Sequence, residues 1–346
     1  MMLNSRFFLC LLLLLSNGIN AHHSNAEYDR SVVTELTGVI SRVIWRNPHV
    51  GLWVDVVNEN GVTDTWRMEA ADLLGTQRRG VSVGTFDIGQ QVTVAGFSST
   101  RREAHMLVTN VLLPNDMEVL LTGAAQPRWS DRILGGGNWV AAAAESEATQ
   151  LDMFRVWTQE STNRPDFAEN PPFTTSARLA FEQYDSYDDP ALQCIQLGMP
   201  RVITFAGPHP IEFEQRGENI VLIGEYFDIE RVIHMNQASI PDSAQYSPLG
   251  YSIGRWEGEG NERALIIETE KINYPFFDIR GISGAPQSME AKYTERFWLN
   301  ADGTELHYDF TMTDPGTFTE TVTAEDYAVW KWRPEIRIMP YQCEVD

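Results

Sequence analysis

The sequence is poor in basic residues. It has only three lysines, and its 26 lysines and arginines stand against 48 aspartates and glutamates, a formal net charge of −22. A surface that binds nucleic acid needs a dense cationic patch, so this composition argues against a nucleic-acid partner. The chain also has no P-loop, dinucleotide-binding, His-Glu-x-x-His or Cys-x-x-Cys pattern. These absences weigh against the common nucleotide-binding proteins, metalloproteases and thiol-redox proteins.

A single apolar run stands out, near residue 1. Arg6 precedes an apolar stretch at residues 7–15, and Ile19-Asn20-Ala21 follows with the small-residue ending that signal peptidase accepts. The stretch is too short to cross a bilayer. We therefore expect residues 1–21 to be a cleaved signal peptide. This predicts a periplasmic or secreted protein that is not transmembrane after processing.

Cysteine is scarce. Of three cysteines, Cys10 lies in the expected leader, and Cys194 and Cys343 remain. Two cysteines left in an exported protein usually pair, so a disulfide between them is predicted. The alternative is two unrelated buried thiols.

Residues 22–116 have the pattern of a small β-domain. The expected strands are short β-branched runs at 34–45, 50–57, 63–69, 91–97 and 105–113, and a short helix fits 70–77. This order is typical of an OB-type five-stranded barrel. Such barrels often bind ligands on the face of strands two and three and through the flanking loops.

The remaining chain divides into two parts. Residues 117–173 contain three consecutive glycines, an alanine run and a Pro-Pro pair, which indicates a mixed connector packed on the domains. Residues 174–346 begin with a short helix that Thr174 or Thr175 can cap, and then return to a β pattern with about eight or nine strands. Tight turns between these strands predict an antiparallel β-barrel or curled sheet, similar to a lipocalin. The fold class expected overall is mainly all-β.

Several motifs carry a family resemblance. They are His22-His23-Ser24 with Glu27-Tyr28-Asp29, residues 36–40, the loop Trp45-Arg46-Asn47-Pro48-His49-Val50, and Trp66 with Glu69. On these motifs, residues 22–114 resemble an exported bacterial family, domain of unknown function family 6152. The family implies no established activity.

The later half is similar to another uncharacterised exported β-rich group. The similarity lies in residues 188–191 with Cys194, in 198–201, in 254–258 and in Asp314-Pro315. In that group a histidine stands just before the Ser-x-Gly-Arg-Trp element, where this chain has Tyr251. A site built on that histidine would therefore be altered in this chain.

Three histidines are candidate metal ligands. Cleavage after Ala21 would give His22 a free amine beside its own imidazole and that of His23, and His49 lies between the first two expected strands. Nitrogen-rich ligation suits copper first and then zinc. The alternative is a solvated chain end and an ordinary turn histidine.

Three charged residues are candidate catalytic groups. Glu225, Arg231 and Glu295 each alternate with apolar neighbours, so all three are expected to face the interior of the larger β-domain. A hairpin centred near Asp228 would set Glu225 opposite Arg231. A desolvated acid of this kind is able to transfer protons. The alternative, which we favour, is a structural ion pair, since no nucleophile with a base accompanies the three.

Arg255, Trp256 and His234 are candidate ligand-binding residues. Gly254-Arg255-Trp256 resembles the Gly-x-Trp element of lipocalin-like barrels, in which an arginine packs over the tryptophan. All three residues, like His209, have a structural alternative as ordinary packing residues.

The sequence therefore favours an exported binding protein of unknown specificity. It would bind a metal at its mature N-terminus, copper or zinc, and a small hydrophobic ligand in the larger β-domain, walled by aromatic residues. Two alternatives are an enzyme that performs acid-base chemistry, such as an isomerase or lyase, on a hydrophobic molecule, and a protein-interaction module.

Overall fold

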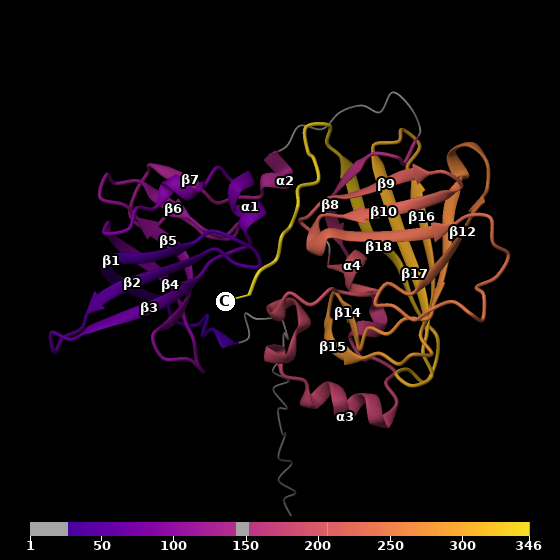
Figure 1. The fold of residues 1–346 in the computed structure, drawn as a ribbon, viewed down its shortest axis with the longest axis horizontal. Helices are drawn as coiled ribbons and strands as arrows, with labels where there is room; N and C mark the ends of the chain where they lie inside the picture. Colours follow the sequence, from indigo (N-terminus) through magenta and orange to yellow (C-terminus); the bar gives the residue numbers. More distant parts are fainter. Residues whose placement is uncertain (1–26, 143–151, 206, 346) are drawn as a thin grey trace, which may run out of the picture.

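The structure is a computed structural model that describes residues 27–142, 152–205 and 207–345. Two β-rich domains lie side by side, with the first in indigo and magenta in Figure 1 and the second in pink, orange and yellow. The mainly all-β fold class is confirmed. Within the described ranges, no helix is long and apolar enough to span a membrane.

The first domain is an OB-type barrel. Its elements are β1 (Thr34–Ile44), β2 (Gly51–Val57), β3 (Thr63–Glu69), α1 (Leu73–Arg78), β4 (Gln91–Ser98) and β5 (His105–Leu112). The strands follow the order β3-β2-β1-β4-β5, and a parallel pairing of β3 with β5 closes the ring. With α1 between β3 and β4, the predicted OB topology is confirmed.

Alternating apolar residues fill the core of this barrel, among them Leu52, Val54, Val94 and Val108, all fully buried. Gly38 in β1 permits a close strand approach, because a Cβ atom there would lie 2.4 Å from the carbonyl oxygen of Asp55. The pattern of period two thus explains both the strands and the face they bury.

The segment 117–173 attaches to both domains. Strands β6 (Glu118–Leu120) and β7 (Ile133–Gly135) extend the OB sheet beyond β5, and α2 (Trp139–Ala142) follows. Strand β8 (Val156–Thr162) instead pairs with two strands of the second domain. The described strands of this segment therefore extend the sheets on either side.

The second domain is a closed barrel of nine strands in the order β10-β11-β12-β13-β16-β17-β18-β8-β9. The strands other than β8 are β9 (Ile211–Arg216), β10 (Asn219–Gly224), β11 (Ile229–His234), β12 (Tyr251–Glu257), β13 (Ala264–Glu270), β16 (Lys292–Leu299), β17 (Glu305–Thr313) and β18 (Val322–Trp332). All neighbouring strands pair antiparallel except β11 and β12, which pair parallel. The long connection between these two strands allows this reversal of direction. The expected winding by sequential hairpins holds only in part, because residues 271–291 separate β13 from β16 and residues 163–210 separate β8 from β9.

Large aromatic side chains fill the interior of the nine-stranded barrel. Phe213, Phe297, Tyr308 and Trp330 are at most 1% exposed and lie in ring contact with one another. The expected alternation in β17 is confirmed, because its even-numbered residues from Leu306 to Met312 are buried. The barrel is therefore a packed core.

Both domains contain short elements outside the two barrels. They are η2 (Val83–Thr85) in the first domain and, in the second, η3 (Asp166–Ala168), α3 (Thr175–Gln183), η4 (Ser186–Asp188), η5 (Pro190–Gln193), α4 (Arg201–Thr204), η6 (Tyr226–Asp228), η7 (Gly260–Glu262), β14 (Phe276–Ile279) and β15 (Ile282–Pro286). Thr174 caps α3, as expected, by accepting a hydrogen bond from the backbone of Ala177.

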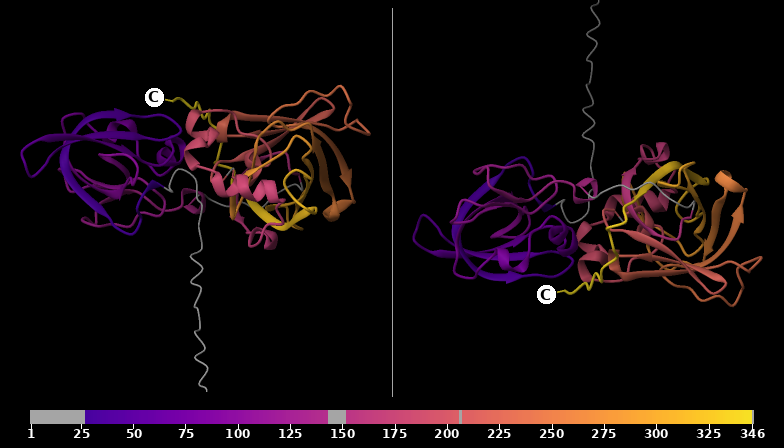
Figure 2. Two further views of the ribbon diagram at one scale, coloured as in Figure 1. Left: turned by 90° about the horizontal axis from the view of Figure 1, so that it is seen from below. Right: turned by 90° about the horizontal axis from the view of Figure 1, so that it is seen from above.

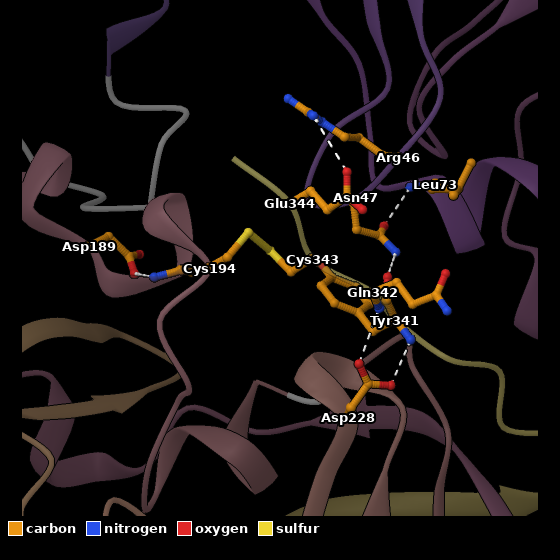
Figure 3. Close-up of a disulfide and its surroundings, with 11 residues drawn as sticks. Arg46, Asn47, Leu73, Asp189, Cys194, Asp228, Tyr341, Gln342, Cys343 and Glu344 are labelled. Atoms are coloured by element: carbon orange, nitrogen blue, oxygen red, sulfur yellow. Dashed lines mark hydrogen bonds and ion pairs between the residues drawn. A yellow bond between two sulfur atoms is a disulfide. The ribbon is translucent and has the colours of Figure 1, made fainter. Parts of the chain in front are cut away.

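The last residues run back between the two domains (Figures 1 and 2). The predicted disulfide between Cys194 and Cys343 is confirmed. It fixes this tail to η5, while the amide N–H of Tyr341 donates to Asp228 at 2.7 Å and that of Glu344 to the carbonyl of Asn47 at 3.0 Å (Figure 3). The tail therefore connects the barrel to the loop between β1 and β2 of the OB domain.

Candidate functional site

Three hollows in the surface meet at His49. The first, which we call the OB cleft, has a volume of about 330 Å³ and is lined by Arg46, His49, Trp53, Arg67, Glu69 and Tyr187. The second, the side hollow, has about 490 Å³ and is lined by Tyr28, His49, Glu69, Phe97 and Leu107, among others. The third, the interdomain cleft, has about 300 Å³ and includes His49, Asp72, Arg201, His209, Tyr226 and Tyr341. Two of these volumes lie within the usual range of ligand pockets and the third lies at its lower limit.

The location of these hollows follows from the fold. His49 lies in the loop between β1 and β2, and Trp53 and Glu69 lie on β2 and β3. These are the elements through which OB barrels bind ligands. The sequence prediction of a binding face at this position therefore coincides with the hollowed part of the surface.

The loop holds His49 in one hydrogen-bonding state. The preceding Asn47 is buried, and its side chain accepts from the backbone N–H of Leu73 at 2.9 Å and donates to the carbonyl of Tyr341. His49 Nδ1 lies 3.1 Å from the carbonyl oxygen of Ala70. A carbonyl only accepts, so Nδ1 carries the proton and a neutral His49 keeps its lone pair on Nε2. This is the arrangement of a metal-ligating or proton-accepting histidine.

Glu69 supplies negative charge beside His49. Burial alone would raise the pKa of the Glu69 carboxyl, but His105, His49 and the Tyr28 hydroxyl outweigh burial and hold that pKa well below its usual value. Tyr28 donates its hydroxyl proton to Glu69 Oε2 at 2.7 Å, and His105 Nε2 lies 3.6 Å from Oε1. Glu69 is therefore ionised at neutral pH.

The first described residue, Glu27, connects this cluster to the second domain. Its buried carboxylate accepts two hydrogen bonds from Arg102, at 2.6 and 3.0 Å, and one from the hydroxyl of Tyr187 in η4. Arg102 also lies 3.5 Å from Glu69. The chain thus enters the described structure at the edge of the candidate site.

Residues 11–107 match the family of unknown function DUF6152. This confirms the resemblance inferred from the N-terminal motifs. The DUF6152 match ends inside β5, so it covers most of the OB barrel, with His49 and Glu69, and none of the second domain. No curated protein matches the chain.

Of the three metal-ligand candidates, only His49 can be placed. His22 and His23 lie outside the described residues. Among the residues that are described, no three His, Cys, Asp or Glu side chains lie close enough together to hold a metal ion. The metal prediction therefore remains a prediction about His49 together with the N-terminal residues.

The expectation that Glu225 lies opposite Arg231 was wrong. Strand β10 ends at Gly224 and Glu225 begins a helical turn, so the alternation of the strand does not continue through it. In the actual register Leu222 is the partner of Arg231. Glu225 instead accepts hydrogen bonds from both terminal nitrogens of Arg78 in α1 and from His209 Nδ1 at 2.9 Å. It therefore joins the two domains.

Arg231 and Glu295 do face the same interior. Arg231 donates to both carboxylate oxygens of Glu295, and also to the hydroxyls of Ser252 and Thr269. Tyr308 donates to Glu295 at 3.1 Å. Both charged residues are at most 2% exposed, and none of the three hollows at His49 reaches them. The geometry favours the structural ion pair over a catalytic group.

The ligand-binding candidates of the barrel lie apart from His49. Arg255 is half exposed and pairs with Glu257 and Glu268 at the surface. The guanidinium that packs over Trp256, at 3.9 Å, belongs to Arg263 instead of the expected Arg255. His234 stacks on Tyr251 at 4.5 Å. The hollow beside Trp256 has only about 60 Å³, which leaves room for a few atoms.

Sequence reasoning named His209 as an ordinary packing residue and did not predict its contacts across the two domains. It is 4% exposed, and its ring stacks on Tyr226 at 5.1 Å. Its partners Glu225 and Asp72 come from different domains, so no spacing in the sequence predicts their contact. The only local signal is that His209 stands between two prolines, which hold it in an extended loop.

We expect acid to loosen the contact between the domains. Burial alone would raise the pKa of Glu225, but hydrogen bonds from His209 and Arg78 outweigh it and lower that pKa. A lowered pKa stabilises the folded state above the unfolded pKa, and this contribution is lost as the pH falls through the folded pKa. Trp139, on which Arg78 packs at 4.5 Å, should therefore change its fluorescence below about pH 4.

The matched variant for this acid transition is Glu225→Gln, which has no charge to lose. Its Trp139 fluorescence should be independent of pH in the same range. An identical transition in the variant and the natural chain would show that another carboxyl is responsible.

Proposed function

We propose that this chain is an exported metal-binding protein, in which His49 Nε2 binds a copper or zinc ion together with the N-terminal amine and the imidazoles of His22 and His23. The single observation that supports this most is the anchoring of His49 through Nδ1 to the carbonyl of Ala70, on the hollowed face of the OB barrel. Such anchoring sets the tautomer of a metal-ligating histidine and raises its basicity.

The course of the chain supports the proposal. Glu27 and Tyr28 pack into the Glu69 cluster, next to His49. Four Cα–Cα steps lead from His23 to Glu27, a length of chain that spans at most about 14 Å. This length is compatible with the proposed ligation by the N-terminal histidines. The ionised Glu69 adds a negative charge that favours a cation.

The test uses protein that begins at His22, verified by mass spectrometry, and a second form with one extra alanine that blocks the amine of His22. We expect the first form to bind one Cu²⁺ tightly in a calorimetric titration. The extended form and the variant His49→Ala should each bind at least about tenfold more weakly, because each loses one nitrogen ligand.

His307→Ala is the matched control. His307 lies on β17 of the second domain, where it stacks on Trp298 at 5.2 Å. Its loss should leave the copper affinity unchanged. Equal affinity of the His49→Ala variant and the natural chain would remove His49 from the site, and loss of copper binding in the His307 variant alone would place the site elsewhere.

A further inference from the structure

The interdomain cleft contains acceptor groups that neither domain uses internally. Its walls come from the loop before α1 on the OB side and from residues 189–226 and Tyr341 on the other side. His209 and Asp72 face each other across it, with His209 Nε2 3.8 Å from Asp72 Oδ1. That distance is too long for a hydrogen bond.

A neutral His209 presents its Nε2 as an acceptor. Its Nδ1 lies 2.9 Å from Glu225 Oε1, and the bidentate contact with Arg78 helps to keep Glu225 ionised. An ionised carboxylate only accepts, so Nδ1 carries the proton of a neutral imidazole. No hydrogen bond from the described residues reaches Nε2.

The other polar groups of the cleft add acceptors and no free cation. Asp72 caps α1 through Oδ1, which accepts from the backbone N–H of Gly75 at 2.6 Å. His49 lines the same cleft with its Nδ1 already donated. Arg201 is bound to both carboxylate oxygens of Asp189, at 2.7 and 2.9 Å, so these two charges cancel. Asp72 adds a negative charge to the cleft, and the guanidinium of Arg79 interacts with that charge.

These acceptors do not converge on one point. In the described part of the chain no group of three histidine, cysteine or acidic side chains is spaced for a metal ion. A ligand several atoms long, with separate hydrogen-bond donors, is able to reach acceptors that a single ion cannot. The rings of Tyr226 and Tyr341 also line the cleft, with centroids 5.4 Å apart, and aromatic faces attract organic cations.

We propose that the interdomain cleft binds a small aliphatic amine that carries a second hydrogen-bond donor. The ammonium group lies between Asp72 and His209 Nε2, the alkyl chain packs on Tyr226 and Tyr341, and the second donor bonds to His49. The ligand then contacts both domains and fills a volume of about 300 Å³. This site shares His49 Nε2 with the metal site proposed above and differs from it in its charged residue, Asp72, so the amine is tested on metal-free protein.

The test compares three probes of similar length in calorimetric titrations of the metal-free protein. They are 4-amino-1-butanol, n-butylamine without the hydroxyl, and 1,4-butanediol without the charge. We expect the amino alcohol to bind most tightly, butylamine about tenfold more weakly, and the diol more weakly still. Equal binding of the diol and the amino alcohol, or no binding of any probe at millimolar concentration, would overturn the proposal.

The variant Asp72→Asn tests whether the amino alcohol binds in the interdomain cleft. Asparagine caps a helix as well as aspartate does, so the variant keeps α1 and loses only the charge. It should bind the amino alcohol at least about tenfold more weakly than the natural chain, with an unchanged thermal midpoint. Asp87→Asn, at an exposed position of the same domain, removes the same charge elsewhere and should change nothing.

A second variant keeps the test decisive if Asp72→Asn alters the fold. His49→Ala leaves α1 and its cap in place and removes the side-chain acceptor for the second donor. It should weaken the amino alcohol to the level of butylamine and leave butylamine itself unaffected. Equal weakening of both probes would contradict the assigned position of the ligand.

Discussion

Glu295→Ala is expected to lower the free energy of unfolding of the nine-stranded barrel by about 3–5 kcal/mol. The substitution leaves Arg231, which is 2% exposed, as an unpaired charge inside a closed barrel. Ser252 and Thr269 still accept from the guanidinium, but hydroxyls do not replace a carboxylate. Urea unfolding followed by tryptophan fluorescence measures the difference.

A double substitution separates two contributions to the free energy of unfolding, the loss caused by an unpaired charge and the stabilisation by the ion pair. Arg231→Met with Glu295→Leu removes both charges and fills the same volume, so it should recover most of the lost stability. Glu268→Ala, on the neighbouring strand β13, removes an exposed partner of Arg255 and should cost at most about 1 kcal/mol. A cost of that size for Glu295→Ala as well would mean that water reaches Arg231.

The OB domain could be predicted from sequence because its information is local. Its strands are short alternating runs such as 63–69, and the turn residues between them leave one plausible order. The short helix expected at 70–77 is α1, which begins at Leu73 because Asp72 caps it. The strand order of an OB barrel predicts which strands and loops bind ligands, and His49 lies in one of these loops. His49 could therefore be named as a candidate from the sequence.

The second domain was predicted less fully, because the position of Glu225 depends on where strand β10 ends. Glu225 shares the parity of Val221 and Ile223, and the face of β10 that turns inward is that of Ile220 and Leu222. The chain also turns after Gly224 and takes Glu225 to Arg78. Glu295, inside the regular part of β16, obeyed the same rule and was placed correctly. Alternation is therefore reliable only within a strand.

Contacts between distant segments were beyond sequence reasoning. The pairing of β8 with β18 joins residues more than 160 positions apart, and His209 meets Asp72 across the two domains. Neither contact has a pattern of spacing. The disulfide was an exception, because only two cysteines remained to be paired after the leader was set aside.

Breaking that disulfide is the second change with a large expected effect. Cys194 and Cys343 are 149 positions apart, and the chain-entropy account gives up to about 5 kcal/mol for closing a loop of this length. Cys343→Ser, or reduction of the natural chain by a dithiol, should lower the thermal midpoint clearly. The dithiol should have no further effect on the variant, which serves as the control for reduction.

Reduction of the disulfide should loosen the C-terminal tail before the rest of the protein. Without it, the tail is held by the bonds from Tyr341 and Gln342 to Asp228 and from Glu344 to Asn47, all near the surface or at the domain contact. Hydrogen exchange of these three amides should accelerate at least about tenfold on reduction, while amides in the core strand β13 stay protected. Because the Asn47 side chain bonds to Tyr341 and stands two residues before His49, the loop that carries His49 should lose protection together with the tail. Protected tail amides in the reduced protein would show instead that the hydrogen bonds alone hold the tail and the loop.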